Sequence, residues 1–360
     1  MLGTIKKLLL GVLGLLALLT LYLLFYPVDI EAVSFDPPDN PGFEGVFSPN
    51  QALSHTSFIL VDMGFGPEDV AFGPDSNFYT GFSDGRIIKF NAQGELLATI
   101  GNTIGRPLGI KVDKEGKLII ADEYKGLISM DELGNIEVLS TEVANTPIAF
   151  ADDLDISSEG IIYFTDASQR NHTYDIEKEF WELQPTGRLL SYNPHTQETR
   201  LELSGLRFAN GVCLGPGEEY LLLTETVGMQ IMKYWIKGPK KGQAEVFSDK
   251  LPGYPDNINF NGDSIFWVAM TQARNPSFEE YYENPFLRKI IRRLPQSFLR
   301  EEAKPMGLVM GIDTHGIVRH FFQTTKGEIH DITSVNQIGN RLYLGNIGHN
   351  ALGVFDLAKK

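Results

Sequence analysis

The sequence predicts an all-β protein, a six-bladed β-propeller that follows an N-terminal transmembrane helix. Two observations support this prediction: a long apolar run near the N-terminus, and a pattern of short strands and glycine-containing turns that recurs six times in the remainder of the chain. We expect three parts: a membrane anchor over residues 1–27, an extended linker over 28–56 and the propeller over 57–360.

The composition is that of a folded chain with an acidic balance. Of the 360 residues, 42% are hydrophobic and 21% are charged, which is typical of a globular protein. The formal net charge of −15 argues against nucleic acid as a partner, because phosphates attract Lys and Arg. The same charge is compatible with binding a cation. The single cysteine, Cys213, excludes an intrachain disulfide, and its apolar neighbours favour a buried structural thiol.

The anchor is predicted from its length and its flanks. Residues 8–26 carry no charge, and an apolar helix of roughly 20 residues crosses a bilayer. A signal peptide is the competing interpretation, but its apolar core is usually shorter and a small-residue cleavage site follows it, whereas this run ends in FYPVDIE. Because Lys6 and Lys7 precede the run, the positive-inside rule predicts a cytoplasmic N-terminus and a propeller on the extracytoplasmic side. Residues 29–49 are rich in Pro, Asp and Gly, as linkers are.

The six copies share a polar or proline-containing start, a strand, a glycine turn and further strands. They begin at PEDVAFGPD, PLGIKVD, ADDLDIS, ANGVCLGP, PDNINFN and ITSVNQI. A base period of about 40 residues with four short strands is typical of propeller blades. A solenoid is the structural alternative, but it needs capping repeats, and we find none in the sequence. We expect the strand SFILV, residues 57–61, to close the ring by joining the last blade.

Two copies carry insertions, over residues 169–186 and 271–306, which we expect in loops on one face of the ring. In the second insertion the apolar residues have helical spacing and alternate with basic ones. Those residues are Phe286, Leu287, Ile290, Ile291, Leu294, Phe298 and Leu299, with Lys289, Arg292, Arg293 and Arg300. The segment is either a helix packed on the blade rim or a lid that also touches the membrane surface, and the two are compatible.

The second residue of each copy is the main candidate for function. These residues are Glu68, Leu108, Asp152, Asn210, Asp256 and Thr333. Because the first strand of every blade lines the central channel, its first residues converge on the axis. Four of the six carry carboxylate or amide oxygens, and the next positions add Asp69, Asp153 and Asn257.

Several carboxylates at one point repel one another unless a cation compensates them. Calcium suits such a set, because it takes about six to eight carboxylate and amide oxygens in flexible geometry. No His or Cys occupies these positions, which disfavours zinc and copper. A single acid at a strand start is equally well explained as a turn former or cap. Four at one register favour a shared calcium ion held by Glu68, Asp152, Asn210 and Asp256.

The same register carries a family resemblance. The stretches GPEDVAFGPD, FADDLDIS, TGRLLSYNPHT, LRFANGVCLGP and LPGYPDNI resemble the strictosidine synthase-like family, in particular its adipocyte plasma membrane-associated protein branch. That family belongs with the gluconolactonase, senescence marker protein and paraoxonase superfamily. The resemblance covers the chain from about residue 27 to the C-terminus. It implies a six-bladed propeller with axial calcium and, in many relatives, hydrolysis of lactones or aryl esters.

The chain departs from the family pattern at three places. Asp152 stands where relatives usually have Asn, which adds a negative charge to the implied ligand set. Leu108 stands near the position of the paraoxonase-type catalytic His, so that mechanism does not transfer. In the last copy no Glu aligns with the strictosidine synthase catalytic Glu, and His330 and Asp331 are nearest.

Three functions remain open on the sequence alone. The first is a calcium-dependent hydrolase of lactones or aryl esters, with Asp256 or Glu68 as the base that deprotonates water and the lid of the fifth copy shaping an apolar pocket. The second is a binding module in which calcium is structural, since a propeller fold does not imply catalysis. The third is amine–aldehyde condensation, which the missing Glu places last.

Overall fold

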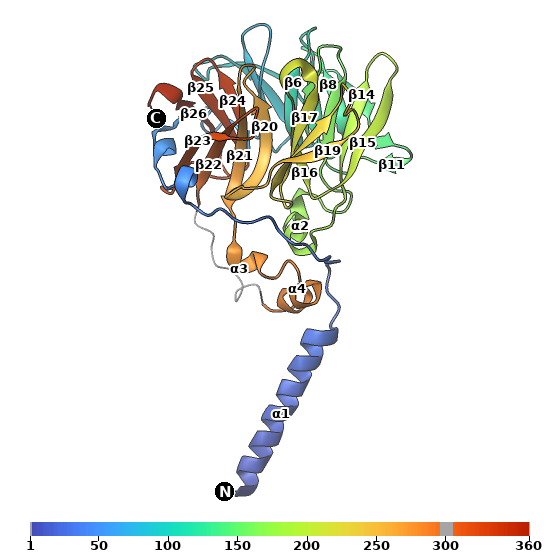
Figure 1. Ribbon diagram of the computed structural model, residues 1–360, viewed down its shortest axis with the longest axis vertical. Coiled ribbons are helices and arrows are strands. Elements are labelled where there is room, and N and C mark those ends of the chain that lie inside the picture. The colour runs from blue at the N-terminus through green and yellow to red at the C-terminus, as the bar shows by residue number, and fades with distance from the viewer. Residues whose placement is uncertain (1, 296–304, 360) are drawn as a thin grey trace.

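The computed structural model describes residues 2–295 and 305–359 and confirms the propeller (Figure 1). Six four-stranded antiparallel sheets form the blades, and five of them run in chain order from the innermost strand outward. The helix α1, Leu2–Phe25, stands apart from the blades. Its segment Gly3–Phe25 has a mean hydropathy of 2.7 and is not buried, so α1 is a candidate membrane span, as the sequence predicts.

The strands are short, and their bounds follow the six copies. The first three blades are β2–β5 (Val70–Phe72, Phe78–Gly81, Arg86–Phe90, Leu96–Asn102), β6–β9 (Pro107–Val112, Leu118–Asp122, Gly126–Met130, Ile136–Ser140) and β12–β15 (Ala151–Ile156, Ile162–Asp166, Gly187–Asn193, Glu198–Leu206). The next two are β16–β19 (Ala209–Leu214, Tyr220–Glu225, Gln230–Trp235, Ala244–Ser248) and β20–β23 (Gly253–Phe260, Ile265–Ala273, Gly307–Asp313, Val318–Thr324). A small hairpin, β10–β11 (Glu142–Val143, Thr146–Pro147), precedes the third blade.

The last blade joins the two ends of the propeller. It consists of β24–β26 (Ile332–Ile338, Arg341–Asn346, Leu352–Asp356) and, as its outermost strand, β1 (Ser57–Ile59). Phe58 of β1 lies opposite Gly353 of β26. The predicted closure by residues 57–61 is therefore confirmed, and it holds the two ends of the propeller together in one sheet.

The core lies between neighbouring blades, where the apolar faces of adjacent sheets meet. At the junction of the fifth and sixth blades, for example, Trp267 and Val309 pack against Leu342 and Leu344. The indole nitrogen of Trp267 donates to the side-chain oxygen of Gln337 at 2.6 Å, which satisfies the one polar atom that this ring buries. Cys213 is likewise buried in such a junction, as its apolar sequence context predicts.

The segment between α1 and the propeller lies along the propeller surface. It contains two short 3-10 helices, η1 (Gly45–Phe47) and η2 (Ala52–His55). Leu53 is fully buried in the core cluster between the last two blades. Asn50 accepts from the backbone N–H of Gln323 at 3.0 Å, and Gln51 accepts from the Thr324 hydroxyl at 3.0 Å, so the segment is also hydrogen-bonded to β23.

Both insertions form helices on one face, between the sheets and α1 (Figure 1). Residues 169–186 form η3 (Thr173–Asp175) and α2 (Glu177–Glu182), and the later insertion forms α3 (Pro276–Glu279) and α4 (Pro285–Arg292). Two further 3-10 turns are η4 (Pro216–Glu218) and η6 (Leu357–Lys359). The predicted helix is present as α4, while Phe298, Leu299 and Arg300 lie outside the described residues.

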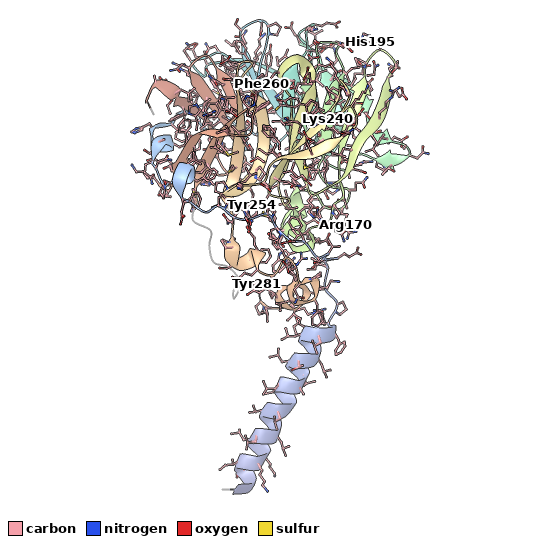
Figure 2. All side chains as sticks on the ribbon, in the orientation of Figure 1. Arg170, His195, Lys240, Tyr254, Phe260 and Tyr281 are labelled. Atoms are coloured by element: carbon pink, nitrogen blue, oxygen red, sulfur yellow. The ribbon has the colours of Figure 1, made fainter. Side chains whose placement is uncertain are left out.

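The innermost strands all start at the face that carries these helices. Figure 2 shows the direction for β20: Tyr254, near its start, lies toward α3, whereas Phe260, at its end, lies at the opposite face. The residues that begin each blade therefore gather on the α1 side of the molecule. That face is the one on which the axial residues must be sought.

Candidate functional site

All six second residues of the copies line one cavity of about 200 Å³ on the axis. They are Glu68, Leu108, Asp152, Asn210, Asp256 and Thr333. The four carboxylate and amide side chains among them are buried, with between 3% and 7% of their surface exposed. The structure thus brings together the predicted oxygen donors, while their role as metal ligands remains a prediction.

A β-bulge at the start of the innermost strand aims these residues. The register shifts between Ala151 and Leu154 in β12, and corresponding shifts occur in β6, β16, β20 and β24. Because a bulge interrupts the alternation of faces, two successive side chains can both be used at the axis. Asp152 lines the cavity, whereas its neighbour Asp153 accepts from the backbone N–H of Val212 in the next blade at 2.9 Å. This arrangement explains the paired acids.

Threonine hydroxyls fix the backbone of the axial residues from the side. Thr165 donates to the carbonyl oxygen of Asn210 at 2.6 Å, and Thr224 donates to that of Asp256 at 2.6 Å. Thr333 does the same for Glu68 at 2.8 Å. In each case the hydroxyl belongs to one blade and the carbonyl to the next, so blade-to-blade contact sets the position of the donors.

Glycines allow neighbouring innermost strands to approach this closely. A Cβ atom at Gly211 would lie 2.5 Å from the Cα of Asn257, and one at Gly109 would lie 2.7 Å from the Cα of Asp153. Both contacts are with backbone that cannot move aside as a flexible side chain would. Glycine is therefore required where the first strands of adjacent blades cross near the axis.

The axial cavity concentrates buried carboxyl groups. Burial is the main cause that raises the pKa values of Glu68, Asp152 and Asp256 well above their ordinary range, and repulsion among these carboxylates adds to it. Hydrogen bonds from Asn257 and Asn210 offset only part of the effect at Asp256. Three buried acids that cannot all ionise freely form a site that favours a cation.

Two buried oxygens of the axial side chains have no partner within the described residues, and neither has Oε2 of Glu179 in the cavity lining. Glu68 Oε2 and Asn210 Oδ1 make no hydrogen bond, although Glu68 Oε1 accepts from the Asn257 side chain at 3.2 Å. Buried oxygens are normally paired, so unpaired ones call for a ligand. Oxygen donors of this kind fit calcium in their chemistry. In the described part of the chain, however, no three His, Cys, Asp or Glu side chains meet as a group that could hold a metal ion.

A lysine lies deeper in the channel, at a position where the repeat pattern predicts no positively charged side chain. Lys111 Nζ is 3.8 Å from Asp69 and donates to the Asn259 side chain at 2.9 Å. Burial alone would lower the pKa of Lys111, but the carboxylates of Asp69, Asp153 and Asp155 outweigh it and raise the pKa. This amine neutralises the second layer of acids. In the sequence, Lys111 is recognisable as the one basic residue in the first strand of the second copy.

The walls of the cavity are apolar and partly aromatic. Leu108, Phe150, Phe208 and Val227 come from the blade starts and turns, and Tyr254 from β20. The repeat pattern identified Leu108 but not the other four, which are common hydrophobic types outside the register of the axial residues.

The helical cover of the cavity differs from the expectation. Ile176 and Phe180, from the insertion of the third copy, line the cavity. Of the predicted lid from the fifth copy, Thr271 and Gln272 at its start line the cavity, whereas the described residues of α3 and α4 do not. That insertion instead supports the wall from behind, where Glu279 of α3 accepts from the Tyr254 hydroxyl at 3.3 Å.

The last blade contributes Asp331 to the cavity edge. Asp331 lies 2.8 Å from the Nδ1 atom of His330, and the ring of His349 lies 4.2 Å from that of His330. Burial and the neighbouring His330 lower the pKa of His349. From this blade the described lining comprises Asp331, Thr333 and Ile347, so no Glu reaches the cavity from the place where the family's condensing enzyme has one.

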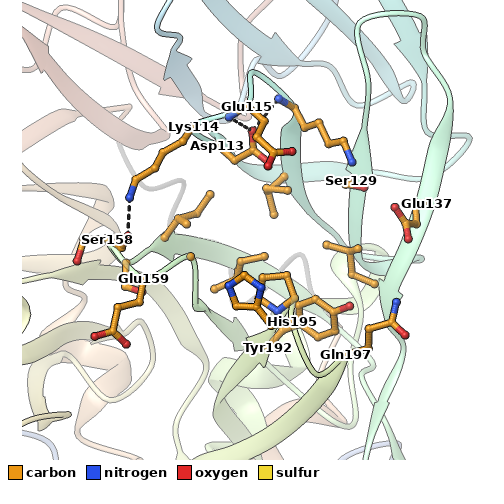
Figure 3. Close-up of a pocket in the computed structure, with 18 residues that line it drawn as sticks. Asp113, Lys114, Glu115, Ser129, Glu137, Ser158, Glu159, Tyr192, His195 and Gln197 are labelled. Carbon is orange, nitrogen blue, oxygen red and sulfur yellow. Dashed lines mark hydrogen bonds between the residues drawn. The ribbon is translucent and has the colours of Figure 1, made fainter.

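A larger cavity, of about 450 Å³, lies between the turns of the second and third blades (Figure 3). Its charged side chains, among them Lys114, Glu115, Glu159 and His195, are exposed to solvent. Lys114 donates to the backbone oxygen of Ser158 at 2.5 Å across one edge. Exposed charges at blade turns are ordinary surface features, so the smaller axial cavity is the better candidate for a site despite its size.

Family models match two parts of the chain: "Strictosidine synthase-like, N-terminal" over residues 45–90 and "Strictosidine synthase" over residues 152–239. Protein STRICTOSIDINE SYNTHASE-LIKE 13 of Arabidopsis thaliana is 36% identical over 338 residues, which cover 82% of this chain and 79% of that protein. Adipocyte plasma membrane-associated protein of Danio rerio is 34% identical over 364 residues, covering 95% and 87%.

Solved structures show the same fold at low sequence identity. A gluconolactonase of Xanthomonas campestris superposes with a TM-score of 0.61 at 15% identity, over 92% of this chain and 98% of that one. Regucalcin of Agrobacterium tumefaciens, described as a calcium-binding protein, gives 0.56 at 13% identity, over 83% and 92%. The solved structures support the assignment of the fold, and the relatives of similar sequence establish the family. The chain belongs to the strictosidine synthase-like family.

Proposed function

We propose that the protein is a membrane-anchored, calcium-dependent hydrolase of lactones or aryl esters. The observation that carries this proposal is the axial cavity, in which buried carboxylate and amide oxygens, among them the unpaired Glu68 Oε2 and Asn210 Oδ1, meet apolar walls. The fold is shared with a gluconolactonase and with a calcium-binding regucalcin, which supports the same class of chemistry.

Glu68, Asp152, Asn210 and Asp256 would hold the ion. When bound, calcium supplies positive charge for the carbonyl oxygen of an ester or lactone. Glu68 and Asp256 both border the cavity, and either one, as an ionised carboxylate, would accept a proton from water at the edge of the site. The walls around Phe150, Phe180 and Phe208 exclude bulk water and receive the apolar part of the substrate.

Condensation of an amine with an aldehyde is not proposed. The described cavity lining contains two glutamates, Glu68 on the axis and Glu179 on α2, and neither comes from the last blade. A binding module remains the alternative, and it would show calcium binding without turnover.

The test uses the full chain in detergent micelles or nanodiscs, assayed on phenyl acetate and on simple lactones. We expect activity that EDTA abolishes and added calcium restores. Asp256→Asn should lower the rate by at least about a hundredfold, because it removes a base and a ligand charge together. The control is Asp263→Asn, an exposed acid in the turn that follows β20 at its far end.

The proposal fails if hydrolysis ignores the chelator and survives Asp256→Asn. Calcium binding without turnover on a broad ester and lactone panel would instead establish the binding module. Binding can be measured separately from turnover by isothermal titration with calcium chloride.

A further inference from the structure

We propose that the mouth of the axial cavity rests on the bilayer that carries α1, and that the site takes amphiphilic esters or lactones from the lipid phase. The substrate class rests on the function proposed above, whereas the contact between this face and the bilayer does not. The occupant of the surface is thus the lipid–water interface of the anchoring membrane.

The end of α1 is fixed to the helices beside the cavity. The Tyr22 hydroxyl donates to the backbone oxygen of Arg293 at 3.1 Å, and the Arg293 side chain donates to the backbone oxygen of Tyr26 at 2.6 Å. Arg292 of α4 in turn donates to Glu177 of α2 at 2.9 Å. Hydrogen bonds therefore link α1, the candidate membrane span, to α4, and α4 to α2. These contacts turn the face with α2–α4 toward the bilayer (Figures 1 and 2).

Exposed apolar side chains lie in loops on the face that carries the cavity mouth, and one of them, Ile347, lines the cavity. They are Phe65 before β2, Ile104 between β5 and β6, Tyr124 between β7 and β8, Tyr174 before α2, and Ile347 between β25 and β26. We call these five residues the apolar rim; their exposed fractions are 54%, 83%, 53%, 77% and 36%, respectively. Single exposed apolar residues are normal on a soluble surface, but five from different loops on one face indicate an interaction site.

Ile104 shows that this exposure has a structural cost. Its φ is 54°, a left-handed conformation that β-branched residues rarely adopt, and its backbone N–H is held by the Asn102 side chain at 2.6 Å. Asn or Gly would occupy this position without strain. A strained residue that presents an isoleucine side chain to solvent, 83% exposed, is best explained by a partner for that side chain.

An aromatic path connects the rim with the cavity wall. The ring of Tyr174 stacks on His172 with 5.5 Å between centroids, and Tyr124 lies 6.0 Å from the same ring. His172 in turn stacks on Phe150, at 6.4 Å, and Phe150 is a buried residue of the cavity lining. An apolar chain that leaves the bilayer at the rim therefore meets apolar surface as far as the axial oxygens.

The cavity lining also indicates the kind of molecule that enters. Beside the axial acids, the lining combines polar side chains, among them Arg106, Glu179 and Gln272, with an apolar set formed by Ile176, Phe180, Phe208 and Val227. An ester or lactone with an acyl or aryl tail matches this division: its carbonyl faces the acids and its tail faces the wall.

The first experiment tests the contact with lipid and needs no catalysis. Single cysteines at Ile104→Cys and, as matched control, Leu133→Cys are labelled with the fluorophore NBD, since native Cys213 is buried and unreactive. Leu133 is 85% exposed in the β8–β9 turn, at the other end of the blade. The full chain is then reconstituted in phosphatidylcholine vesicles with doxyl-labelled lipid. We expect the NBD emission to be blue-shifted and quenched by the labelled lipid at position 104, and to be water-like at position 133. Water-like emission at both positions overturns the proposal. An apolar signal at position 104 that persists in lipid-free micelles containing a co-purified protein also overturns it.

The second experiment tests delivery of the substrate. The double variant Ile104→Asp/Tyr174→Asp keeps the cavity intact, and Asp tolerates the backbone at 104 better than Ile does. We expect about a tenfold lower rate on a long-chain aryl ester embedded in vesicles and an unchanged rate on water-soluble phenyl acetate. Leu133→Asp should leave both rates unchanged. Equal rates for the double variant and the wild type on the vesicle substrate overturn the delivery step. A wild-type chain that is inactive on both substrates refutes the proposed hydrolase function. In that case the NBD measurement still decides whether the face contacts the membrane.

Discussion

Asp152 and Asp153 are adjacent acids that serve different surroundings. One carboxylate reaches the axial cavity, and the other accepts a backbone hydrogen bond from the next blade. Side chains in a regular strand would point to opposite faces, so the bulge at this point is what lets both acids be used near the axis. Burial and nearby Asp69 raise the pKa of Asp153 to about 7 even though Lys111 lowers it, so this pair is sensitive to pH.

The raised carboxyl pKa values predict a pH-dependent response to calcium. Glu68, Asp152 and Asp256 hold protons in the folded chain at pH values where the unfolded chain has lost them, so the stability of the ion-free protein falls as the pH rises above about 4. Calcium replaces those protons. Its stabilising effect, about 2.7 kcal/mol at a hundred times Kd, should therefore grow with pH.

Thermal unfolding of the full chain, with calcium chloride or with EDTA, measures this response. We expect the calcium-induced rise in Tm to be small at acidic pH and to increase through the region near pH 7 in which Asp153 titrates. Asp256→Asn should reduce the rise at every pH. A rise that stays constant across the range, or that falls as the pH increases, would contradict a shared carboxylate site.

At this scale the sequence predicted the axial oxygens but not their surroundings. Glu68, Asp152, Asn210 and Asp256 were found because they repeat at one register, and the ring geometry then places them together. Lys111 and Tyr254 have no equivalent in the other copies, so periodicity carries no information about them. Their importance comes from contacts across the channel that only the folded ring creates.

At the scale of elements, the segment before the propeller behaves as part of the fold. Residues 28–56 have a linker-like composition, yet Leu53 is fully buried between the last two blades and the neighbouring Asn50 and Gln51 are bonded to β23. Composition reports only average polarity. One leucine at the right place is enough to dock a polar segment.

We expect Leu53→Ala to destabilise the protein by about 2–5 kcal/mol, because it empties a fully packed position. Leu133→Ala is the matched control, since Leu133 is 85% exposed and its truncation should leave the free energy of unfolding unchanged. Chemical denaturation followed by tryptophan fluorescence measures both. Similar stabilities for the two variants would show that the segment is only loosely attached.

The insertions illustrate the other limit of sequence reasoning. The helical spacing around Ile290 predicted α4 correctly, because an amphipathic period is a local property. Which insertion covers the cavity is not determined by local sequence. It depends on how α2 and α3 pack on each other, through contacts such as the T-shaped pair of Trp181 and Phe278 at 4.7 Å between ring centroids.

At the scale of the whole molecule, the charges beside α1 predict its orientation. Lys6 and Lys7 flank the N-terminal end of the apolar helix, so the propeller should lie on the side of the membrane away from the cytoplasm. In intact cells, a membrane-impermeant maleimide should label Leu133→Cys without permeabilisation and Gly3→Cys only after it. The wild-type chain is the control, since its one cysteine is buried. The reverse pattern would show the opposite topology.

The closure of the ring by β1 has a consequence for biosynthesis. Ser57 and Val354, which are hydrogen-bonded across β1 and β26, are 297 residues apart in the chain. At about 5–20 residues per second, a ribosome needs about 15 to 60 s between making these two partners. During that interval the nascent propeller is an open arc in which β1 has no partner, and the ring closes only when β26 emerges.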